Sequence, residues 1–453
     1  MVHRPRRPFL PCAAFLCLLL VLIRPEGLRS QNGNSAELTQ TLSLDEAIHR
    51  AQQNEPAFAA AVADRKSASI DQYLAKAALL PTAVYHNQVL YTQPNGQTNQ
   101  GGQAGTQPSP IFIANNAVHE YASQASINET IGLKQFASIH TAEANAARST
   151  VELEIARRGL VAAVVSLYYG VANANRKLAL LEEALKESQD FADQTQKREK
   201  AREVAHADVL KAQLQEQLRK RDLMDAKVAA AKAKLELGVL LFPDPRTSYE
   251  TIAPEASKTL PTRAEMIASA GARSPEVKSA LASMKVADAD VLTAKSAYLP
   301  DLGLNFTYGI DAPQFARRGE AGVNNLGYAM SATLDIPVWD WFSTQKKVKQ
   351  SEIRRAVARV TLSMAQRRFV ATFEEAYVEA TTAHDQIDLL DLSVRTATES
   401  LRLTRLRYTA GEATALEVVD AQTTLLTAQA SQADGLYRYE SALANLQLLT
   451  GTL

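Results

Sequence analysis

The chain has 453 residues, with 49 basic and 49 acidic side chains and only two cysteines. This balance lacks the excess of positive charge that nucleic-acid binding requires, so we expect no nucleic-acid partner. Both cysteines, Cys12 and Cys17, lie in the N-terminal thirty residues. The rest of the chain has no cysteine, so we expect no disulfide, iron–sulfur cluster or thiolate metal site there.

The N-terminal segment has the pattern of a secretory signal peptide. Three arginines precede an apolar run, 9–23, which ends at an Arg-Pro pair. Fifteen residues are too few for a membrane-spanning helix, so we predict a signal peptide over 1–30, with a signal anchor as the alternative. Removing this segment deletes five Arg and one Glu, which leaves 44 basic and 48 acidic residues.

The remaining chain contains one unit twice. Residues 44–81 match 263–300 at a constant offset of 219, and both copies have two prolines 25 residues apart. Further on, 206–213 matches 416–422 at an offset of 209, so the second copy is shorter in its middle. Such self-similarity indicates an internal duplication.

A proline-rich segment separates the two copies. Four prolines fall within 243–262, which predicts a linker. We therefore divide the chain into the signal peptide, a first repeat over 31–242, the linker, and a second repeat over 263–453.

Each repeat is predicted to consist mainly of helices in the same order. A short helix ends at Asn54 or Ser274, and Pro56 or Pro275 begins the next helix, where the fixed φ of proline and its missing N–H are tolerated. A β-hairpin follows, and then long proline-free runs rich in helix-forming residues. The longer helices are predicted at 56–81, 134–199, 203–241, 275–299, 343–408 and 412–449.

The predicted lengths indicate how the helices are arranged. At 1.5 Å per residue the helix over 134–199 is about 100 Å long, and the two shorter helices of its repeat add up to nearly the same length. We therefore expect two shorter helices laid end to end along one long helix. Apolar residues over 412–449 form two seams, which predicts a neighbour on each side and a wall of helices. A buried helix of an ordinary bundle is the alternative.

Two segments alternate between apolar and polar residues. Residues 301–310 have an apolar side chain at every second position, and 325–336 repeats the pattern. Alternation over about ten residues, with tyrosines and long polar loops, is typical of strands that cross an outer membrane. We predict hairpins at about 83–131 and 301–336; soluble, half-buried hairpins are the alternative.

Four strands cannot close a barrel, and an open sheet edge cannot face lipid because its N–H and C=O groups would be unpaired. If these strands span a membrane, several chains must share one barrel, and at least a dimer follows. Pro81, Pro300 and Pro337 then lie at the junctions between helix and strand, where proline ends a helix and turns the chain.

Taken together, these features resemble the TolC family of outer-membrane efflux and secretion channels. The resemblance rests on four features: the paired segments "NEP…LLP" and "RSP…YLP", "IPVWDW" at 336–341, "RYTAGEATALEVVDAQTTLLTAQ" at 407–429, and "LLTG" at 448–451. It implies a homotrimer with a twelve-stranded β-barrel in the outer membrane and a helical tunnel across the periplasm. It also implies a periplasmic adaptor and an inner-membrane transporter docked at the far end.

The resemblance implies a gate at the periplasmic helix tips. Gly411 matches the glycine of the turn between the long and medium helices, Tyr408 a tyrosine that narrows the tip, and Asp208 its partner aspartate on a neighbouring coil. Glu417 and Asp420 match acidic rings. Three copies of these carboxylates around a narrow axis would repel one another and favour cations.

This sequence departs from the family pattern at two positions of the tips. The first repeat has Arg202 where the second has Gly411, and Ala413 stands at the position of an arginine that binds the same aspartate. We expect Arg202 or Arg407 to substitute for that arginine. Trp339 and Trp341 either anchor a membrane interface or pack the helix–strand junction, and packing is the favoured interpretation.

Enzymatic function is not expected. The histidines are scattered, and the chain has no HExxH motif, no metal-spaced cluster and no Gly-rich phosphate loop, so we expect no cofactor and no metal. The favoured hypothesis is a passive exit duct in the outer membrane, gated at its periplasmic tips and driven by its partners. The alternatives are a structural or adhesive coiled-coil protein of the outer membrane without transport and, third, an adaptor of the membrane-fusion class.

Overall fold

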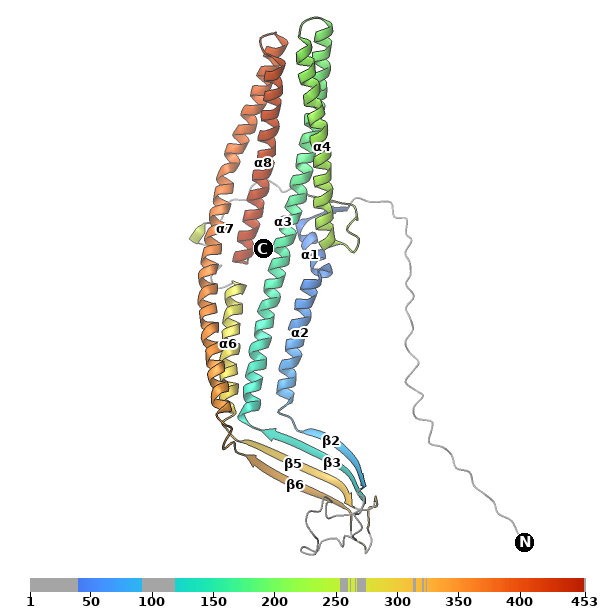
Figure 1. Ribbon diagram of the computed structural model, residues 1–453, viewed down its shortest axis with the longest axis vertical. Helices are drawn as coiled ribbons and strands as arrows, with labels where there is room; N and C mark the ends of the chain where they lie inside the picture. The colour runs from blue at the N-terminus through green and yellow to red at the C-terminus, as the bar shows by residue number, and fades with distance from the viewer. Residues whose placement is uncertain are drawn as a thin grey trace, which may run out of the picture.

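The structure of the protein is a computed structural model that describes residues 40–91, 119–252, 260, 262–264, 266, 274–312, 315–319, 322 and 324–451. The predicted signal peptide and most of the short helix predicted before Ser274 lie outside these residues. The described chain is mainly helical. A four-stranded sheet lies at one end of the long axis, and the two turns that connect the long helices to the helices after them lie at the opposite end (Figure 1).

The described elements follow one another in the order predicted for two repeats. They are β1 (Gln40–Leu42), α1 (Leu44–Asn54), α2 (Pro56–Ala77), β2 (Thr82–Tyr91), β3 (His119–Ile131), α3 (Leu133–Lys200), α4 (His206–Leu241), β4 (Tyr249–Thr251), α6 (Pro275–Ser296), β5 (Asp301–Ala312), β6 (Leu326–Asp335), α7 (Ser343–Thr409) and α8 (Ala415–Thr450). Strand β4 lies within the segment predicted as a linker.

The end-to-end arrangement of helices is confirmed. Helices α2 and α4 follow one another along α3, and α6 and α8 follow one another along α7 (Figure 1). Pro56 and Pro275 are the first residues of α2 and α6, as predicted. The Ser274 hydroxyl accepts a hydrogen bond from the Val277 amide and so caps α6.

Helix α8 packs against neighbours on two of its sides, as its two apolar seams predicted. It packs against α7 on one side and against α3 on the other. Val418, Tyr439 and Leu446 are completely buried in these contacts. The wall of helices therefore continues within one chain from α4 and α3 to α8 and α7.

An apolar core lies midway along the helices, next to a tyrosine that bonds to the ends of two short strands. Strands β1 and β4 pair in parallel, so the start of the first repeat is joined to the segment that follows it. The buried Tyr168 hydroxyl of α3 donates to the Leu42 carbonyl at 2.8 Å and accepts from the Ile252 amide at 3.0 Å. Leu237 and Val164 pack in the same core.

The four longer strands form one antiparallel sheet in the order β2-β3-β5-β6. One row across it consists of Tyr85, Ala125, Tyr308 and Tyr328. Neighbouring rows alternate: the row Thr82, Asn128, Asn305, Ser331 lies on the opposite face. The sheet thus has a mainly apolar face and a polar face, as the alternating sequence predicted.

The two helix–strand junctions have the same geometry in both repeats. Helix α2 ends at Ala77 and is followed by tight turns in which the Leu79 and Leu80 amides donate to the carbonyls three residues before them. The amides of Tyr298 and Leu299 do the same after α6. Pro81 and Pro300 then directly precede β2 and β5, because proline has no N–H with which to continue these turns. Pro337 lies two residues after the end of β6.

Replacing Tyr168 by Phe is expected to loosen β1 and β4. The change removes the hydroxyl from the Leu42 carbonyl and the Ile252 amide, which keep only their mutual bond of 3.4 Å, at a cost of about 1 kcal/mol. Thermal unfolding and amide hydrogen exchange of β1 and β4 measure the loss. Tyr437→Phe is the matched control, since its exposed hydroxyl lies 3.5 Å from the Ser166 carbonyl. Equal behaviour of the two variants would contradict the assignment.

Candidate functional site at the helical tips

Each pair of long helices ends in a turn with one residue of left-handed conformation. Arg202 has φ +62° and Gly411 has φ +81°. In the first turn the Glu203 amide donates to the Arg198 carbonyl at 2.9 Å and the Arg202 amide to the Glu199 carbonyl at 2.8 Å. The second turn repeats both bonds 209 residues later, and the pattern is that of the Schellman motif.

The departure at Arg202 therefore leaves the turn geometry unchanged. A residue with a Cβ in this conformation costs about 1 kcal/mol or more, whereas glycine adopts it freely. At Gly411 no atom beyond the two neighbouring residues of the chain lies within 4 Å of the place where a Cβ would be, so only the backbone conformation favours glycine there. The backbone of the first turn is therefore strained at Arg202, whereas that of the second turn is unstrained at Gly411.

Tyr408 is buried between the two coils, α3–α4 and α7–α8. Its hydroxyl donates to Thr195 Oγ1 of α3 at 3.2 Å, and its ring lies 5.3 Å from that of Phe191. The guanidinium of Arg198 stacks 4.8 Å above the ring, and Arg198 Nη1 donates to the Tyr408 carbonyl at 2.7 Å. Within one chain the tyrosine thus has Thr195 as its hydroxyl partner, and not the predicted Asp208.

Arg198 is the residue that the sequence analysis missed at this site. We expected Arg202 or Arg407 to substitute for the arginine absent at Ala413. Arg407 instead binds Glu417 at 3.5 Å and the Glu412 carbonyl at 3.2 Å, within its own turn. At the offset of 209, Arg198 is the counterpart of Arg407 in the first repeat, and this correspondence could have identified Arg198 from the sequence.

The acidic residues predicted for the entrance lie near the first turns of α4 and α8. Glu417 forms a capping box with Thr414, and the Thr414 backbone amide holds the pKa of this carboxyl below its ordinary value. Its contribution to stability is therefore complete above the ordinary pKa of Glu and is lost as the pH falls through the lowered one. Asp420 is exposed, and Asp208 is half-buried in the first turn of α4.

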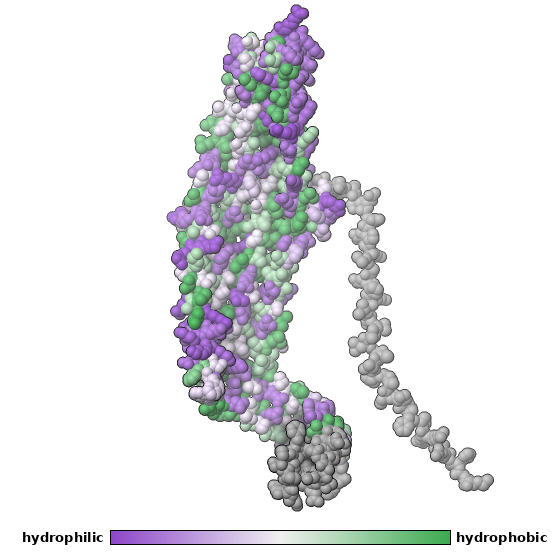
Figure 2. Space-filling view, in the orientation of Figure 1, coloured by the Kyte–Doolittle hydropathy of each residue, from purple (hydrophilic) through white to green (hydrophobic). Residues whose placement is uncertain are grey.

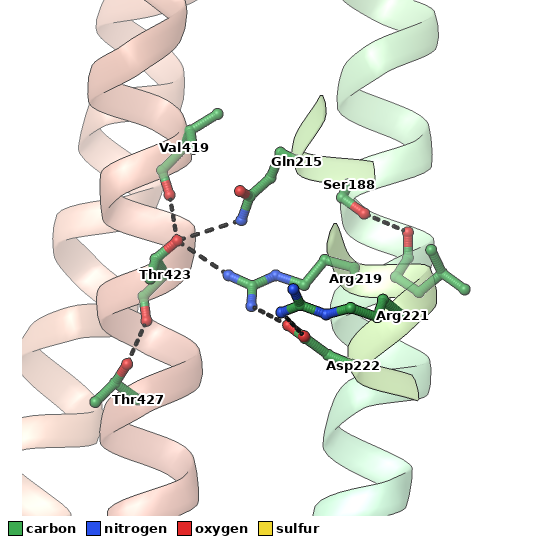
Figure 3. A network of polar contacts seen from close by, with 9 residues as sticks. Ser188, Gln215, Arg219, Arg221, Asp222, Val419, Thr423 and Thr427 are labelled. Carbon is green, nitrogen blue, oxygen red and sulfur yellow. Dashed lines mark hydrogen bonds and ion pairs between the residues drawn. The ribbon is translucent and has the colours of Figure 1, made fainter. Parts of the chain in front are cut away.

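Further from the tips, polar contacts connect the two coils. Arg219 of α4 donates to the Thr423 hydroxyl of α8 at 3.0 Å (Figure 3). The side-chain oxygen of Gln215 accepts from the Arg219 guanidinium at 2.7 Å and lies 3.3 Å from the same hydroxyl. Two ion pairs continue the connection, between Arg405 and Glu187 at 3.1 Å and between Lys177 and Asp434 at 2.7 Å. The contact between the coils is therefore partly polar along this section.

Buried polar side chains lie along this section of α4 and α8. Arg219 is buried and has Asp222 as its acidic neighbour at 3.4 Å (Figure 3). Both side-chain amide atoms of the buried Gln422 are without a hydrogen-bond partner. Because a buried polar group that lacks partners costs free energy, Gln422 lowers the stability of α8 along this section.

Among the residues that the structure describes, no group of three His, Cys, Asp or Glu side chains could hold a metal ion. The comparison with known proteins gives the family. The outer membrane efflux protein family matches residues 47–241 and 266–452, one match in each repeat. The chain belongs to this family.

Individual relatives resemble the protein over most of its length. The outer membrane protein TolC of Escherichia coli K12 is 23% identical over 92% of this chain and 84% of its own. The alkaline protease secretion protein AprF of Pseudomonas aeruginosa is 23% identical over 91% of this chain and 85% of its own. The crystal structure of the Campylobacter jejuni CmeC outer membrane channel shares the fold, with a TM-score of 0.77 and 16% identity over 90% of this chain and 85% of that one.

The two tip turns are expected to respond in opposite ways to changes at the left-handed residue. Arg202→Gly removes the strain and should slow hydrogen exchange of the Glu203 amide about fivefold, for about 1 kcal/mol, whereas Gly411→Ala should speed exchange of the Glu412 amide by a similar factor. Ala201→Gly is the control, because Ala201 is right-handed at φ −78° and glycine there should speed exchange. Faster exchange in Arg202→Gly would refute the strain.

Proposed function

We propose that the protein is the outer-membrane exit duct of a tripartite efflux or type I secretion system, a passive trimeric channel whose helical part crosses the periplasm. The observation that carries this proposal is the sheet. Among the described residues, β2 and β6 form its two edges and have no further partner strand, while one face of the sheet is apolar and exposed. Family membership supports the same conclusion.

The open edges require a second chain if the sheet lies in lipid. An unpaired N–H or C=O in a bilayer costs several kcal/mol, so an edge strand of ten residues cannot face hydrocarbon. All neighbouring strands are antiparallel, and this order makes β6 of one chain antiparallel to β2 of the next. Three chains then contribute twelve strands to one closed barrel, within the size range of outer-membrane barrels.

The helical part of one chain also has two sides whose apolar residues are exposed, one at each edge of the wall of helices. Apolar side chains are exposed along the length of the helices (Figure 2). No residue of α2 is buried, and Ile70, Tyr73 and Leu74 on this helix are exposed. On the opposite side of the wall, α7 exposes a stripe at helical spacing: Ile353, Val357, Val360 and Met364. Contact between the α7 side of one chain and the α2–α4 side of the next would close a ring.

The assembled ring would be a passage without chemistry of its own. The polar face of the sheet would line the barrel, and the helical walls would continue it as a tunnel. Cargo would then move because an adaptor and an inner-membrane transporter deliver it, as the resemblance to TolC-type channels implies. AprF is named for the secretion of a protease, which supports an export duct over the structural or adhesive alternative.

The gate would lie at the helical tips. Arg198 and Tyr408 hold the α3–α4 coil against the α7–α8 coil, and separation of the coils would widen the entrance. Glu417 and Asp420, present three times around the axis, would give the entrance its preference for cations. Asp208, half-buried beside the first tip, would add to this acidic entrance.

Single-channel recording of the purified protein in a planar bilayer tests this function. The wild-type assembly should conduct weakly, and Arg198→Ala should raise its conductance, because each loss of about 1.4 kcal/mol raises the population of separated tips about tenfold. Arg407→Ala is the matched control, since among the described residues this counterpart binds Glu417 and the Glu412 carbonyl, both within its own turn, and makes no bond to the other coil.

Two outcomes would contradict the proposal at different levels. An assembled protein that carries no ion current at any voltage would refute the channel. A current that rises equally in Arg198→Ala and Arg407→Ala would retain the channel but refute the role of Arg198 in the gate.

A further inference from the structure

A buried glutamine lies in the contact between the two coils near the tips. Gln422 of α8 is 8% exposed, and neither its side-chain oxygen nor its side-chain nitrogen has a hydrogen-bond partner. Among the described residues it is the one side chain that has two buried polar atoms without a partner. Because buried polar groups in proteins are nearly always bonded, this exception requires a physical explanation.

The residues next to Gln422 on its face of α8 are apolar. Val418 lies one turn before it and Leu425 one turn after it, and both are buried. They belong to an apolar cluster that joins α8 to α7, α3 and α4, which we call the tip cluster: Phe191, Ala192, Ala212, Ala397, Leu401, Tyr408, Ala415, Val418 and Leu425. Gln422 therefore interrupts the α8 side of an apolar contact between the coils.

Other buried polar side chains along this contact are bonded. The Ser188 and Thr195 hydroxyls of α3 each donate to a backbone carbonyl of their own helix at 2.8 Å. The buried Arg219 of α4 donates to Thr423, the residue after Gln422 (Figure 3). Polar side chains are thus accommodated here where a partner lies within reach. Gln422 has none, so its burial lowers the stability of the joined coils.

The tip cluster is rich in alanine. Four of its nine buried members are alanines: Ala192, Ala212, Ala397 and Ala415. A methyl group buries less apolar area than a leucine side chain, so each alanine adds little to the free energy that joins the coils. The cost of one unpartnered amide is therefore set against a contact with few large apolar side chains.

We propose that Gln422 is the residue that keeps the gate able to open. The proposal rests on the function proposed above, in which separation of the coils widens the entrance. While the coils are joined, the amide of Gln422 is buried without a partner, and when they separate, water hydrates it. The amide therefore favours the separated state and opposes Arg198 and Tyr408, which hold the coils together.

Gln422→Met tests the proposal, because methionine nearly keeps the length of the side chain and has no amide. In a planar bilayer the assembled variant should have an open probability about tenfold lower, which corresponds to about 1.4 kcal/mol. Measurement in the Arg198→Ala background keeps this decrease detectable. Hydrogen exchange of the α8 amides from Val418 to Leu425 should slow by a similar factor, and Gln422→Leu should change both quantities in the same direction. Gln429→Met, at a half-buried position two turns further along α8, is the matched control and should change neither.

Leu425→Gln is the reverse test, since it places a second amide in the tip cluster and should raise the open probability and speed the exchange. A Gln422→Met variant that opens as often as the wild type, or more often, would refute the proposal, because the amide would then be neutral or would join the coils through water. A wild-type assembly without any current would instead refute the proposed function. Hydrogen exchange needs no current and then decides by itself whether Gln422 weakens the contact.

Discussion

The structure is organised by the requirement that every backbone N–H and C=O in a membrane has a partner. One chain supplies four long strands whose alternation suits lipid on one face and water on the other, but β2 and β6 remain open. The helical section is incomplete in a similar way, because α2 and α7 leave apolar side chains exposed to water. Sheet and helices are incomplete at the same two sides, and the closed ring of chains proposed above would satisfy both.

The duplication explains why the molecule is regular, and the differences between the copies show where it is specialised. Both repeats have the same proline junctions and the same tip turns, including the left-handed residue. The middle is held by an apolar core and by Tyr168, whereas the two coils are joined toward the tips by Arg198, Tyr408 and polar contacts. A stiff middle and weakly joined tips suit a passage that opens at one end.

Much of this fold could be predicted from the sequence because its signals are local. Pro56 and Pro275 fix helix starts, the period of two over 301–310 fixes a strand, and the two seams of α8 predict two neighbours. Side-chain partners could not be predicted in the same way. That Tyr408 meets Thr195, and that Arg198 stacks on it, depends on how far two helices are rotated and shifted against each other. The pairing of β1 with β4 depends likewise on segments about 200 residues apart.

The central claim is that β6 of one chain pairs with β2 of the next, and disulfide cross-linking tests it most directly. Both native cysteines lie in the predicted signal peptide, so introduced cysteines would be the only thiols of the mature chain. His86→Cys on β2 is combined in turn with cysteine at the residues on the same polar face of β6, which are Gly327, Ala329, Ser331 and Thr333. The account predicts that at least one combination oxidises to a covalent trimer and to nothing larger, while each single variant stays uncross-linked. Monomers in every combination, or a ladder that continues beyond three chains, would contradict it.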